Sequence, residues 1–569
     1  MFKNLVKLLI VMGVCLVASV PAYAASINVI DSGAAGDGKT DNSKIFTNLL
    51  TFIGNKAVTL NLQKGIYRFG SNITIPSNVT LNFEEGAVIS VDSEKTFTIN
   101  GAFNANASPI FTGPGNVIGS TVPNGVYPQW WGAIGDGFTN DTGAVQAAMD
   151  FAATLQNNKV VAIPEGTYSV RNLYYRQGIS IAGNGSSSVL KADSSCVVWN
   201  SIIECESIDG VNINGVIFDG NKNVIPGDDQ SGVVNMWVTN CTNVQITNCT
   251  FQHNWYVGIN INNCNVLSFV NNRFIDLDCG IITMHTPSNN ILIDGNYFDG
   301  SDMSEPISIY GTKEGYHNNI TITNNIIKNH IYGHGILLRA AKNVVVENNT
   351  IDRNGTGIKC AAATYNGIEY GVSDSKIMNN TISNTTYEGI LLESISNSTI
   401  SGNNVKNAGS YGLLTWDVTS CKLMDNTIQD SNTIGQTTGI GGIVFNGLKN
   451  SIVSGNKVSM KDGAKAALCR AQISLNGTKN EVANNTFSAN TGYPATLKMY
   501  EVNTAYALDN IFAENKLTDA SNIDLDEART ESSKSGTAMT GTKAAATNNK
   551  TPANKQTVTK NDNAGSKKR

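Results

Sequence analysis

Acidic and imidazole side chains recur at one position of successive short segments in the middle of the chain. Glu305 and His334 each come directly before the Pro or Gly that opens a run of apolar residues, and Asp278 lies one step before Cys279, the equivalent residue of an earlier run. A protonated carboxylic acid, a carboxylate and an imidazole are the usual groups of general acid–base catalysis. We therefore predict Asp278 and Glu305 as acid and base, with His334 assisting. The alternative for His334 is a turn residue in a glycine-rich coil.

A second set of residues in the same region suits binding of a sugar chain: Tyr310, Arg339, Lys359, Glu393 and Trp416. Aromatic faces stack on pyranose rings, whereas carboxylate and guanidinium groups address hydroxyl or uronate groups. Hydrolysis needs one protonated acid and one carboxylate that activates water. Lysis needs a cation to hold the uronate and a base to remove the C5 proton. The sequence leaves both reactions open, and it leaves Arg339 and Glu393 the alternative of a surface ion pair.

The elements that must position these residues are indicated by an asparagine that recurs at steps of 23 to 31 residues, with an apolar residue two positions after it. This alternation predicts a strand in each repeat, because helical repeats would show a period near 3.6. Short strands joined by turns at this spacing predict an all-β solenoid, the parallel β-helix. The recurring residues are Asn272, Asn296, Asn325, Asn349, Asn380, Asn403, Asn426, Asn456, Asn485 and Asn515.

The asparagines have a structural explanation. Stacked amides at a turn hydrogen-bond along the ladder and tolerate left-handed backbone. The Asn-x-Ser/Thr matches at Asn349, Asn380 and Asn485 fall on ladder positions, so we give them little weight as glycosylation sites.

Stacking of the coils brings equal offsets of the repeat together. Successive coils of such a solenoid lie about 4.8 Å apart, so Glu305 and His334 become neighbours in one column on the outside of a sheet. Another column is predicted to be apolar and outward-facing, and such a stripe would mediate trimerisation or be covered by a loop. Its members are Ile282, Leu337, Leu391, Leu414 and Val444.

One sequence motif occurs twice near the front of the chain. Residues 33–41 read Gly-Ala-Ala-Gly-Asp-Gly-Lys-Thr-Asp, and residues 132–141 read Gly-Ala-Ile-Gly-Asp-Gly-Phe-Thr-Asn-Asp. A helical pattern follows each copy, with apolar residues at Ile45, Leu49, Phe52 and Ile53 and then at Val145, Ala148, Met149 and Ala152. We interpret Asp37 and Asp136 as residues that hold a turn and not as catalytic groups.

With these motifs the chain resembles the pectate-lyase-like superfamily of right-handed β-helices. Its rhamnogalacturonase-like and tailspike-like members open with the same glycine-rich motif and a capping helix. The resemblance implies an all-β, right-handed parallel β-helix with short N-terminal capping helices. It says less about activity, because the superfamily includes lyases, hydrolases, epimerases and structural proteins.

A partial resemblance to polygalacturonases concerns the candidate site. Gly333-His334-Gly335 resembles the Gly-His-Gly signature of that family, in which the histidine assists paired aspartates on preceding coils. Asp278 is the counterpart of the earlier aspartate, and Lys359 matches the lysine of an Arg-Ile-Lys motif. Glu305 stands in place of an aspartate pair, and Gly357 replaces the arginine.

The two ends of the chain differ from its body. Lys3 and Lys7, the apolar run at 8–20 and Ala22-Tyr23-Ala24 predict a signal peptide and a secreted protein without a transmembrane segment. Residues 529–569 carry nine Lys and Arg against two acidic residues, which predicts a disordered basic tail. The whole chain has a net charge of −5 and its body is more acidic still, which argues against a nucleic-acid partner.

The cysteines predict neither a disulfide framework nor a metal site. Nine remain after removal of the signal peptide, an odd number, and neither Cys-x-x-Cys nor a paired-histidine spacing occurs. Cys241 and Cys264 are one coil apart, which suits stacked thiols or a bridge between coils. No cofactor is firmly implied, and Ca²⁺ is a candidate only if the protein is a lyase.

These patterns divide the chain into a signal peptide (1–24), an N-terminal β module (25–125), a main β-helix (126–528) and the tail (529–569). The leading hypothesis is a secreted glycoside hydrolase or polysaccharide lyase that acts on an acidic or pectin-like glycan. The alternative is a non-catalytic surface or matrix protein for adhesion or glycan binding, for which a homotrimer is one arrangement.

Overall fold

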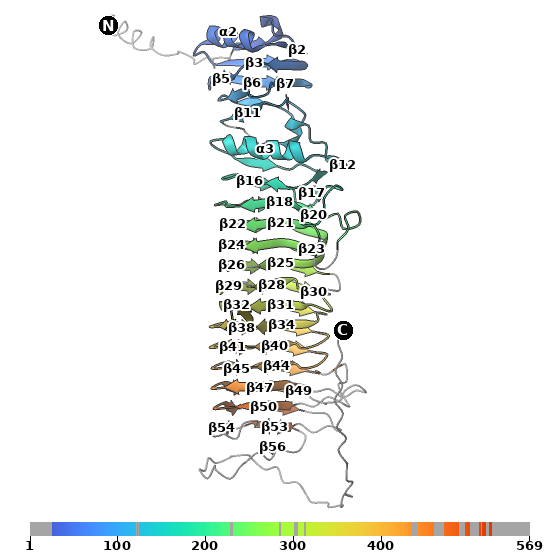
Figure 1. The fold of residues 1–569 in the computed structure, drawn as a ribbon, viewed down its shortest axis with the longest axis vertical. Helices are drawn as coiled ribbons and strands as arrows, with labels where there is room; N and C mark the ends of the chain where they lie inside the picture. The colour runs from blue at the N-terminus through green and yellow to red at the C-terminus, as the bar shows by residue number, and fades with distance from the viewer. Residues whose placement is uncertain are drawn as a thin grey trace, which may run out of the picture.

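The computed structural model describes residues 25–120, 122, 124–227, 231–283, 286–300, 305–311, 315–431, 433, 442–459, 472–488, 496–500, 511–513, 515–518 and 523–525. Over these residues the chain winds into one long stack of short parallel strands (Figure 1). The predicted signal peptide and basic tail lie outside the described residues. The all-β solenoid predicted from the repeats is confirmed.

The first part of the stack is a three-sided β-helix in its own right, and all its strand pairs are parallel. One side contains β1 (Ala25–Asn28), β3 (Val58–Leu62), β6 (Val79–Phe83) and β9 (Phe103–Asn104). The second contains β2 (Asp37–Asp41), β4 (Gly65–Phe69), β7 (Ala87–Val91) and β10 (Phe111–Thr112). The third contains β5 (Ile73–Ile75), β8 (Thr96–Ile99) and β11 (Asn116–Gly119). The boundary that we place at residue 125 remains a prediction.

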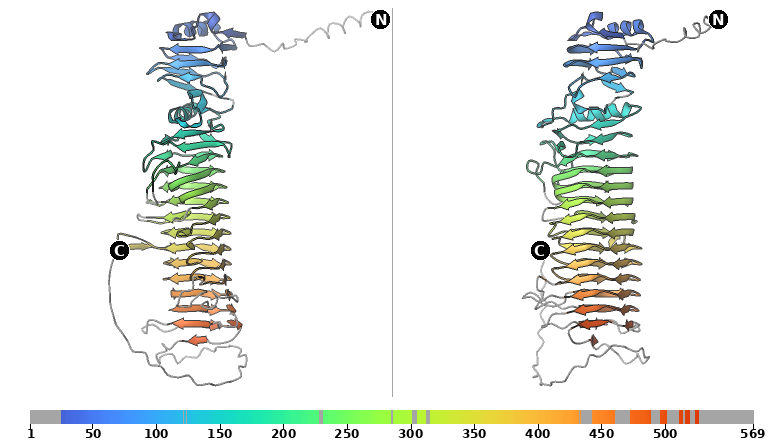
Figure 2. Two further views of the ribbon diagram at one scale, coloured as in Figure 1. Left: turned by 90° about the vertical axis from the view of Figure 1, so that its right-hand side faces the viewer. Right: turned by 180° about the vertical axis from the view of Figure 1, so that it is seen from behind.

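The main stack repeats the same architecture over many more coils, and the views in Figure 2 show its regular layering. One side runs from β13 (Val160–Ala162) to β54 (Ile511–Ala513), and a second from β14 (Gly166–Val170) to β55 (Lys516–Thr518). The third side carries the candidate site. Its strands in that region are β23 (Thr250–Asn262), β25 (Arg273–Thr283), β28 (Ile307–Tyr310), β31 (His334–Arg339), β34 (Thr356–Ala361), β40 (Ile390–Glu393), β44 (Leu413–Trp416) and β47 (Ile443–Lys449).

The asparagine ladder runs through the interior of this stack. Both the backbone N–H and the side-chain amide of Asn380 donate to Oδ1 of Asn403, at 3.1 and 2.9 Å, and Asn403 donates in the same way to Asn426. These asparagines are fully buried. The left-handed backbone belongs to the residue before them, such as Asn379 with φ of 55°. The ladder is therefore structural, and burial of Asn349, Asn380 and Asn485 removes them as glycosylation acceptors.

Apolar residues of the same turn stack as regularly as the asparagines. The rings of Phe218, Phe251, Phe274 and Phe298 lie nearly parallel in successive coils, with centroids 4.6–5.1 Å apart. Parallel pairing in register places identical side chains above one another, so the core is continuous along the stack.

The two copies of the glycine-rich motif form the same turn. Asp37 accepts hydrogen bonds from the N–H groups of Lys39 and Thr40, and Asp136 accepts them from those of Phe138 and Thr139. The bonds from Thr40 chiefly lower the pKa of Asp37, to about 2. This geometry agrees with a turn-holding role for both aspartates.

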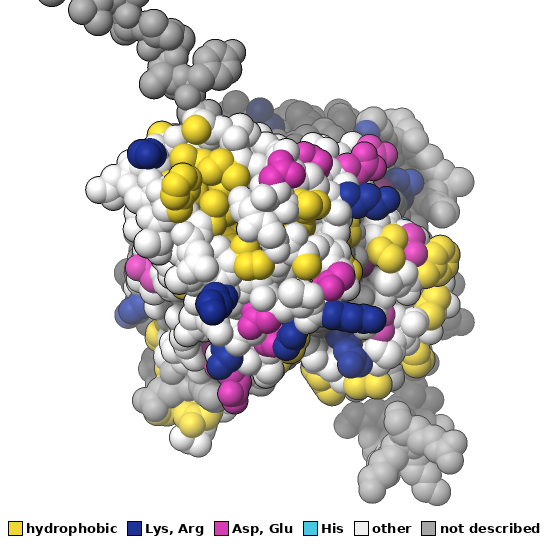
Figure 3. All heavy atoms as spheres, turned by 90° about the horizontal axis from the view of Figure 1, so that it is seen from above, with side chains coloured by type: hydrophobic (Ala, Val, Ile, Leu, Met, Phe, Trp, Pro, Cys, Tyr) yellow, Lys and Arg dark blue, Asp and Glu magenta, His cyan; other side chains and the backbone are white. Residues whose placement is uncertain are grey.

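A helix follows each turn. Helix α2 (Ser43–Ile53) caps the beginning of the stack, and α3 (Thr142–Thr154) lies at the junction between the module and the main stack (Figure 1). The apolar face predicted for α3 is buried as expected. In α2 the prediction was wrong for Phe52, whose side chain is 77% exposed, because the helix turns Phe46 inward instead. Figure 3 views this capped end of the stack, where apolar side chains lie among charged side chains of both signs.

This corrected face makes a stability prediction. Leu49→Ala removes a buried side chain, so we expect the free energy of unfolding to fall by about 2–3 kcal/mol. Phe52→Ala, on the same helix, should change it by less than about 0.5 kcal/mol, since the ring contributes little burial. Urea unfolding followed by circular dichroism measures both. Equal losses for the two variants would contradict the orientation of α2.

The aromatic segment at residues 127–131 packs between the two parts of the stack. Trp130 is 3% exposed, and its ring centroid lies 5.0 Å from that of Phe103 in the N-terminal module. The ring centroid of Trp131 lies 5.5 Å from that of Phe151 in α3. The aromatic segment at residues 127–131 thus belongs mainly to an interior junction.

Candidate functional site

The strand register places the predicted catalytic residues on neighbouring coils. Ile307 of β28 pairs with Ile336 of β31, so Glu305, two residues before Ile307, lies opposite His334. His334 in turn pairs with Thr356 of β34. Parallel strands keep this alignment along the stack, and the two residues are therefore about one strand spacing, about 4.8 Å, apart along the column.

The surroundings of Glu305 and His334 shift their proton affinities in opposite directions. Burial raises the pKa of Glu305 above its usual range, and the charges of Arg339 and Lys359 partly offset this rise. Burial, helped by Lys359 and Arg339, lowers the pKa of His334 to about 4. The cluster therefore combines a carboxyl group that retains its proton to higher pH with an imidazole that is neutral at neutral pH.

One ring nitrogen of His334 also has no hydrogen bond to the described part of the protein. Within the described residues, Nδ1 of His334 and Nε of Arg339 are buried atoms that have no hydrogen-bond partner. A buried donor or acceptor without a partner is costly, and such atoms are common where a ligand completes the hydrogen bonding.

Two of the predicted binding residues, Arg339 and Tyr310, contact each other. Arg339 pairs in register with Tyr310, and its guanidinium carbon lies 5.1 Å from the centre of the Tyr310 ring. Lys359 lies near both Glu305 and His334, since its charge acts on the pKa of each. Both cations therefore lie within electrostatic range of the acid–base pair, and Tyr310 lies beside Arg339.

The alternative of an Arg339–Glu393 ion pair was wrong. Glu393 pairs instead with Lys359, with Nζ and Oε2 3.4 Å apart. Arg339 pairs with Ala361 on the next coil, and Glu393 lies one coil further on, so about two strand spacings, or about 9.6 Å, separate them along the column.

Two predicted residues lie towards the margins of this cluster. Asp278 is 6% exposed and lies beside Cys279, whose thiol is 3.9 Å from its carboxylate, and beside Tyr256, whose pKa it helps to raise. Trp416 is 50% exposed and pairs with Glu393. It is three coils beyond Arg339, so it would contact only an extended ligand.

Glu388 is a carboxylate of the same column for which the sequence analysis predicts no role. Thr356 donates to one of its oxygens at 3.2 Å and Ser410 to the other at 3.0 Å. The spacing of the repeats places Glu388 in the column, but only the structure reveals that hydroxyl groups hold it.

The predicted apolar stripe is not an open surface. Its five residues form the expected column, yet each is only 5–9% exposed. Ser308 and Lys359 also interrupt it. An exposed apolar strip was the argument for a homotrimer, which remains a prediction without that support.

The cysteines and possible metal ligands add no further centre in the described part of the chain. Cys241 and Cys264 are free, and Sγ of Cys264 accepts a hydrogen bond from the backbone of Cys241 at 3.3 Å. No three His, Cys, Asp or Glu side chains of the described residues come close enough to hold a metal ion. In the same residues, no helix has the length and hydrophobicity required to cross a membrane.

Sequence comparison agrees with this architecture. Residues 286–428 and 366–565 match the family model described as the right handed beta helix region. With the parallel stack, this defines the class: the chain folds as a right-handed parallel β-helix.

Particular relatives are distant. The plasmin and fibronectin-binding protein A of Streptococcus pneumoniae is 24% identical over 278 residues, which are 46% of this chain and 36% of that protein. The chain thus spans little more than a third of the curated relative. Among solved structures, the A-module of a mannuronan C-5 epimerase from Azotobacter vinelandii has a TM-score of 0.41 at 16% identity, covering 69% of this chain and 98% of that one. A surface adhesin of Streptococcus pneumoniae has a TM-score of 0.34 at 15% identity, covering 69% and 90%.

Proposed function

We propose that this protein is an extracellular or surface-located enzyme that cleaves an acidic polysaccharide by β-elimination at a uronate residue. The observation that carries the proposal is the pairing of Glu305 and His334 on neighbouring coils, with oppositely shifted pKa values, beside Arg339 and Lys359. Elimination requires a neutral base, a proton donor and cations that hold the carboxylate, and the cluster contains one candidate for each.

In the proposed reaction His334 removes the proton from C5 of the uronate. The electron pair of that C–H bond forms the C4=C5 double bond, and the bond from C4 to the glycosidic oxygen breaks. Glu305 gives its proton to the leaving oxygen, while Arg339 and Lys359 neutralise the carboxylate charge that develops during proton removal. The products are one unsaturated uronate end and one new reducing end.

Hydrolysis is supported less well. Hydrolases place two carboxylates about 5–9.5 Å apart across the scissile bond. Glu388 is three coils from Glu305, about 14 Å along the column. Asp278, the other candidate, is enclosed beside Tyr256 and Cys279. Asp278 stays in the proposal as the carboxylate on which a hydrolase would depend.

The test uses the purified chain with pectic, alginate and neutral polysaccharides, each with and without Ca²⁺. New reducing ends and the absorbance of unsaturated uronates are recorded together. Both signals with an acidic polymer support the proposal. Reducing ends without unsaturation would instead establish hydrolysis, and silence over the panel would favour a non-catalytic role.

The pH dependence should report the two shifted groups. The base is active above the pKa of His334, about 4, and the acid is active below the raised pKa of Glu305. Lys359→Gln removes a charge that lowers both pKa values, so both limbs of the profile of kcat/KM should move to higher pH. Lys342→Gln, which removes a lysine that lies over Tyr316, should leave the profile unchanged. A limb that moves to lower pH in Lys359→Gln would contradict the assignment.

The second candidate function is adhesion without catalysis. The relative that favours it is the plasmin and fibronectin-binding protein A, at 24% identity over 46% of this chain. Polymer binding that persists while every polysaccharide remains uncleaved would support this function.

A further inference from the structure

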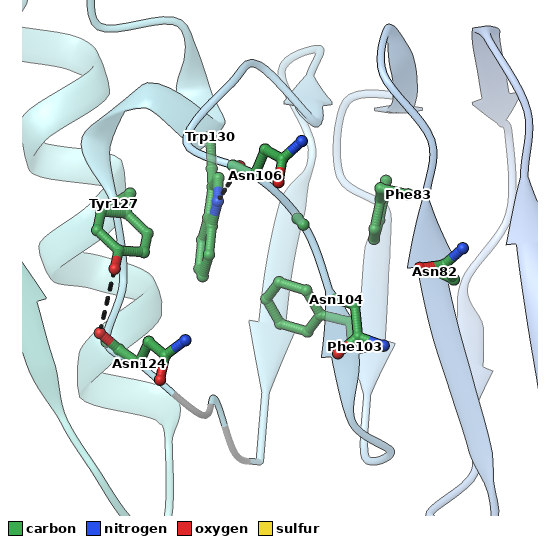
Figure 4. Close-up of a pocket in the computed structure, with 10 residues that line it drawn as sticks. Asn82, Phe83, Phe103, Asn104, Asn106, Asn124, Tyr127 and Trp130 are labelled. Atoms are coloured by element: carbon green, nitrogen blue, oxygen red, sulfur yellow. Dashed lines mark hydrogen bonds between the residues drawn. The ribbon is translucent and has the colours of Figure 1, made fainter.

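A pocket of about 190 Å³ lies far from the Glu305–His334 cluster, at the junction of the N-terminal module and the main stack (Figures 1 and 4). The strands β6 and β9 and the segment 105–106 supply one part of its lining. The segment 124–130, which leads into the main stack, supplies the other. The pocket thus lies where strands of the N-terminal module meet the segment that leads into the main stack.

Aromatic rings form the base and one wall of this pocket. Phe103 and Trp130 are almost fully buried, and Tyr127 is half-buried at the wall. Adjacent rings are steeply inclined, 62° between Phe103 and Trp130 and 76° between Tyr127 and Trp130. Figure 4 shows these rings crossing the pocket without a parallel pair. A flat base would be held best between parallel rings, whereas a puckered saturated ring fits C–H groups against inclined faces and edges.

Amide groups surround the opening. Asn104, Asn106 and Asn124 are exposed, and none of their side chains hydrogen-bonds to the described residues. Asn82 donates to Asn61 at 3.1 Å, which leaves its own oxygen as an acceptor. Among the described residues that line the pocket, none is charged. Amides offer donors and acceptors together, as hydroxyl groups require, and an uncharged lining cannot neutralise an ionic ligand.

We propose that this pocket binds a single neutral pyranose, as one residue of a glycan. The volume is below the roughly 300–1,000 Å³ of sites for drug-sized molecules, so it admits one ring and not an oligosaccharide. The proposal is independent of catalysis, because a neutral sugar held at the junction anchors a glycan without meeting Glu305 or His334. It would attach the protein to a polymer whose cleaved residues are acidic but whose other residues are neutral.

The test follows Trp130 in the full chain labelled with fluorotryptophan, with its resonance assigned by Trp130→Phe. The probes are methyl β-glucopyranoside, methyl β-galactopyranoside and N-acetylglucosamine, with adenosine as the planar competitor. A saturable shift of the Trp130 resonance with at least one sugar is expected. The double variant Asn106→Ala/Asn124→Ala should weaken that binding by about tenfold or more, since each lost hydrogen bond costs about fivefold.

Matched variants make the result decisive. Asn116→Ala removes an exposed amide of the same module outside the pocket and should leave the affinity unchanged. Glu305→Gln should also leave it unchanged, which separates this site from the proposed active site. The inference is overturned if no sugar saturates the Trp130 shift, if adenosine binds more tightly than every sugar, or if the double variant binds as the native chain does.

Discussion

Replacing His334 with alanine is expected to lower kcat/KM on a uronate polymer by about 10²–10⁴-fold, the usual contribution of a positioned acid or base. The loss should fall on kcat more than on KM, because Arg339 and Lys359 still bind the carboxylate. Glu305→Gln, which keeps the shape of the side chain but cannot give up a proton to the leaving oxygen, should cause a loss of similar size. Initial rates of unsaturated-uronate formation measure both.

The control is His253→Ala. His253 is a partly exposed histidine that contacts Asp219 at 2.9 Å on another part of the stack, so its loss should leave the rate within about twofold of the native value. Circular dichroism checks that each variant is folded. If His334→Ala retained full activity while Asp278→Asn lost it, a hydrolase with a carboxylate pair would replace the elimination mechanism.

The largest stability effect is expected at the centre of the asparagine ladder. Asn403→Leu removes the side-chain hydrogen bonds to Asn426 and to the carbonyl of Ile377, and it leaves the two donors of Asn380 without their acceptor. Buried groups without partners cost about 1–3 kcal/mol each, so we expect a loss of about 3–5 kcal/mol in the free energy of unfolding. Faster amide hydrogen exchange in the coils on either side should accompany it, since each coil contacts only its neighbours.

The neighbouring residue supplies the comparison. Asn404 is exposed on β43 (Asn404–Lys406), outside the ladder, so Asn404→Ala should change stability by less than about 0.5 kcal/mol. If the two variants were equally stable, the ladder would contribute nothing beyond ordinary surface asparagines.

The fold could be predicted from the sequence because the strand register of a parallel β-helix produces a regular repeat in the amino-acid sequence. A residue one coil later lies directly above its predecessor, so a recurring Asn with an apolar residue two positions on reveals both the strand and the turn. Parts of the helix predictions were less secure. Residues Phe46 and Phe52 both fit an apolar face of α2, and only packing against the first coils decided that Phe46 is inside.

For the candidate site, too, some features follow from the repeat spacing and others only from the tertiary structure. Repeat spacing by itself determined that Glu305 and His334 share a column and that Tyr310 and Arg339 share another, because stacking converts sequence offsets into neighbours. Only the tertiary structure decided the pKa shifts, the partner of Glu393 and the burial of the apolar column, since each depends on distances between columns and on solvent exclusion. The pocket at the junction likewise depends on how the N-terminal module contacts the main stack, and the repeats within each stack do not predict that contact.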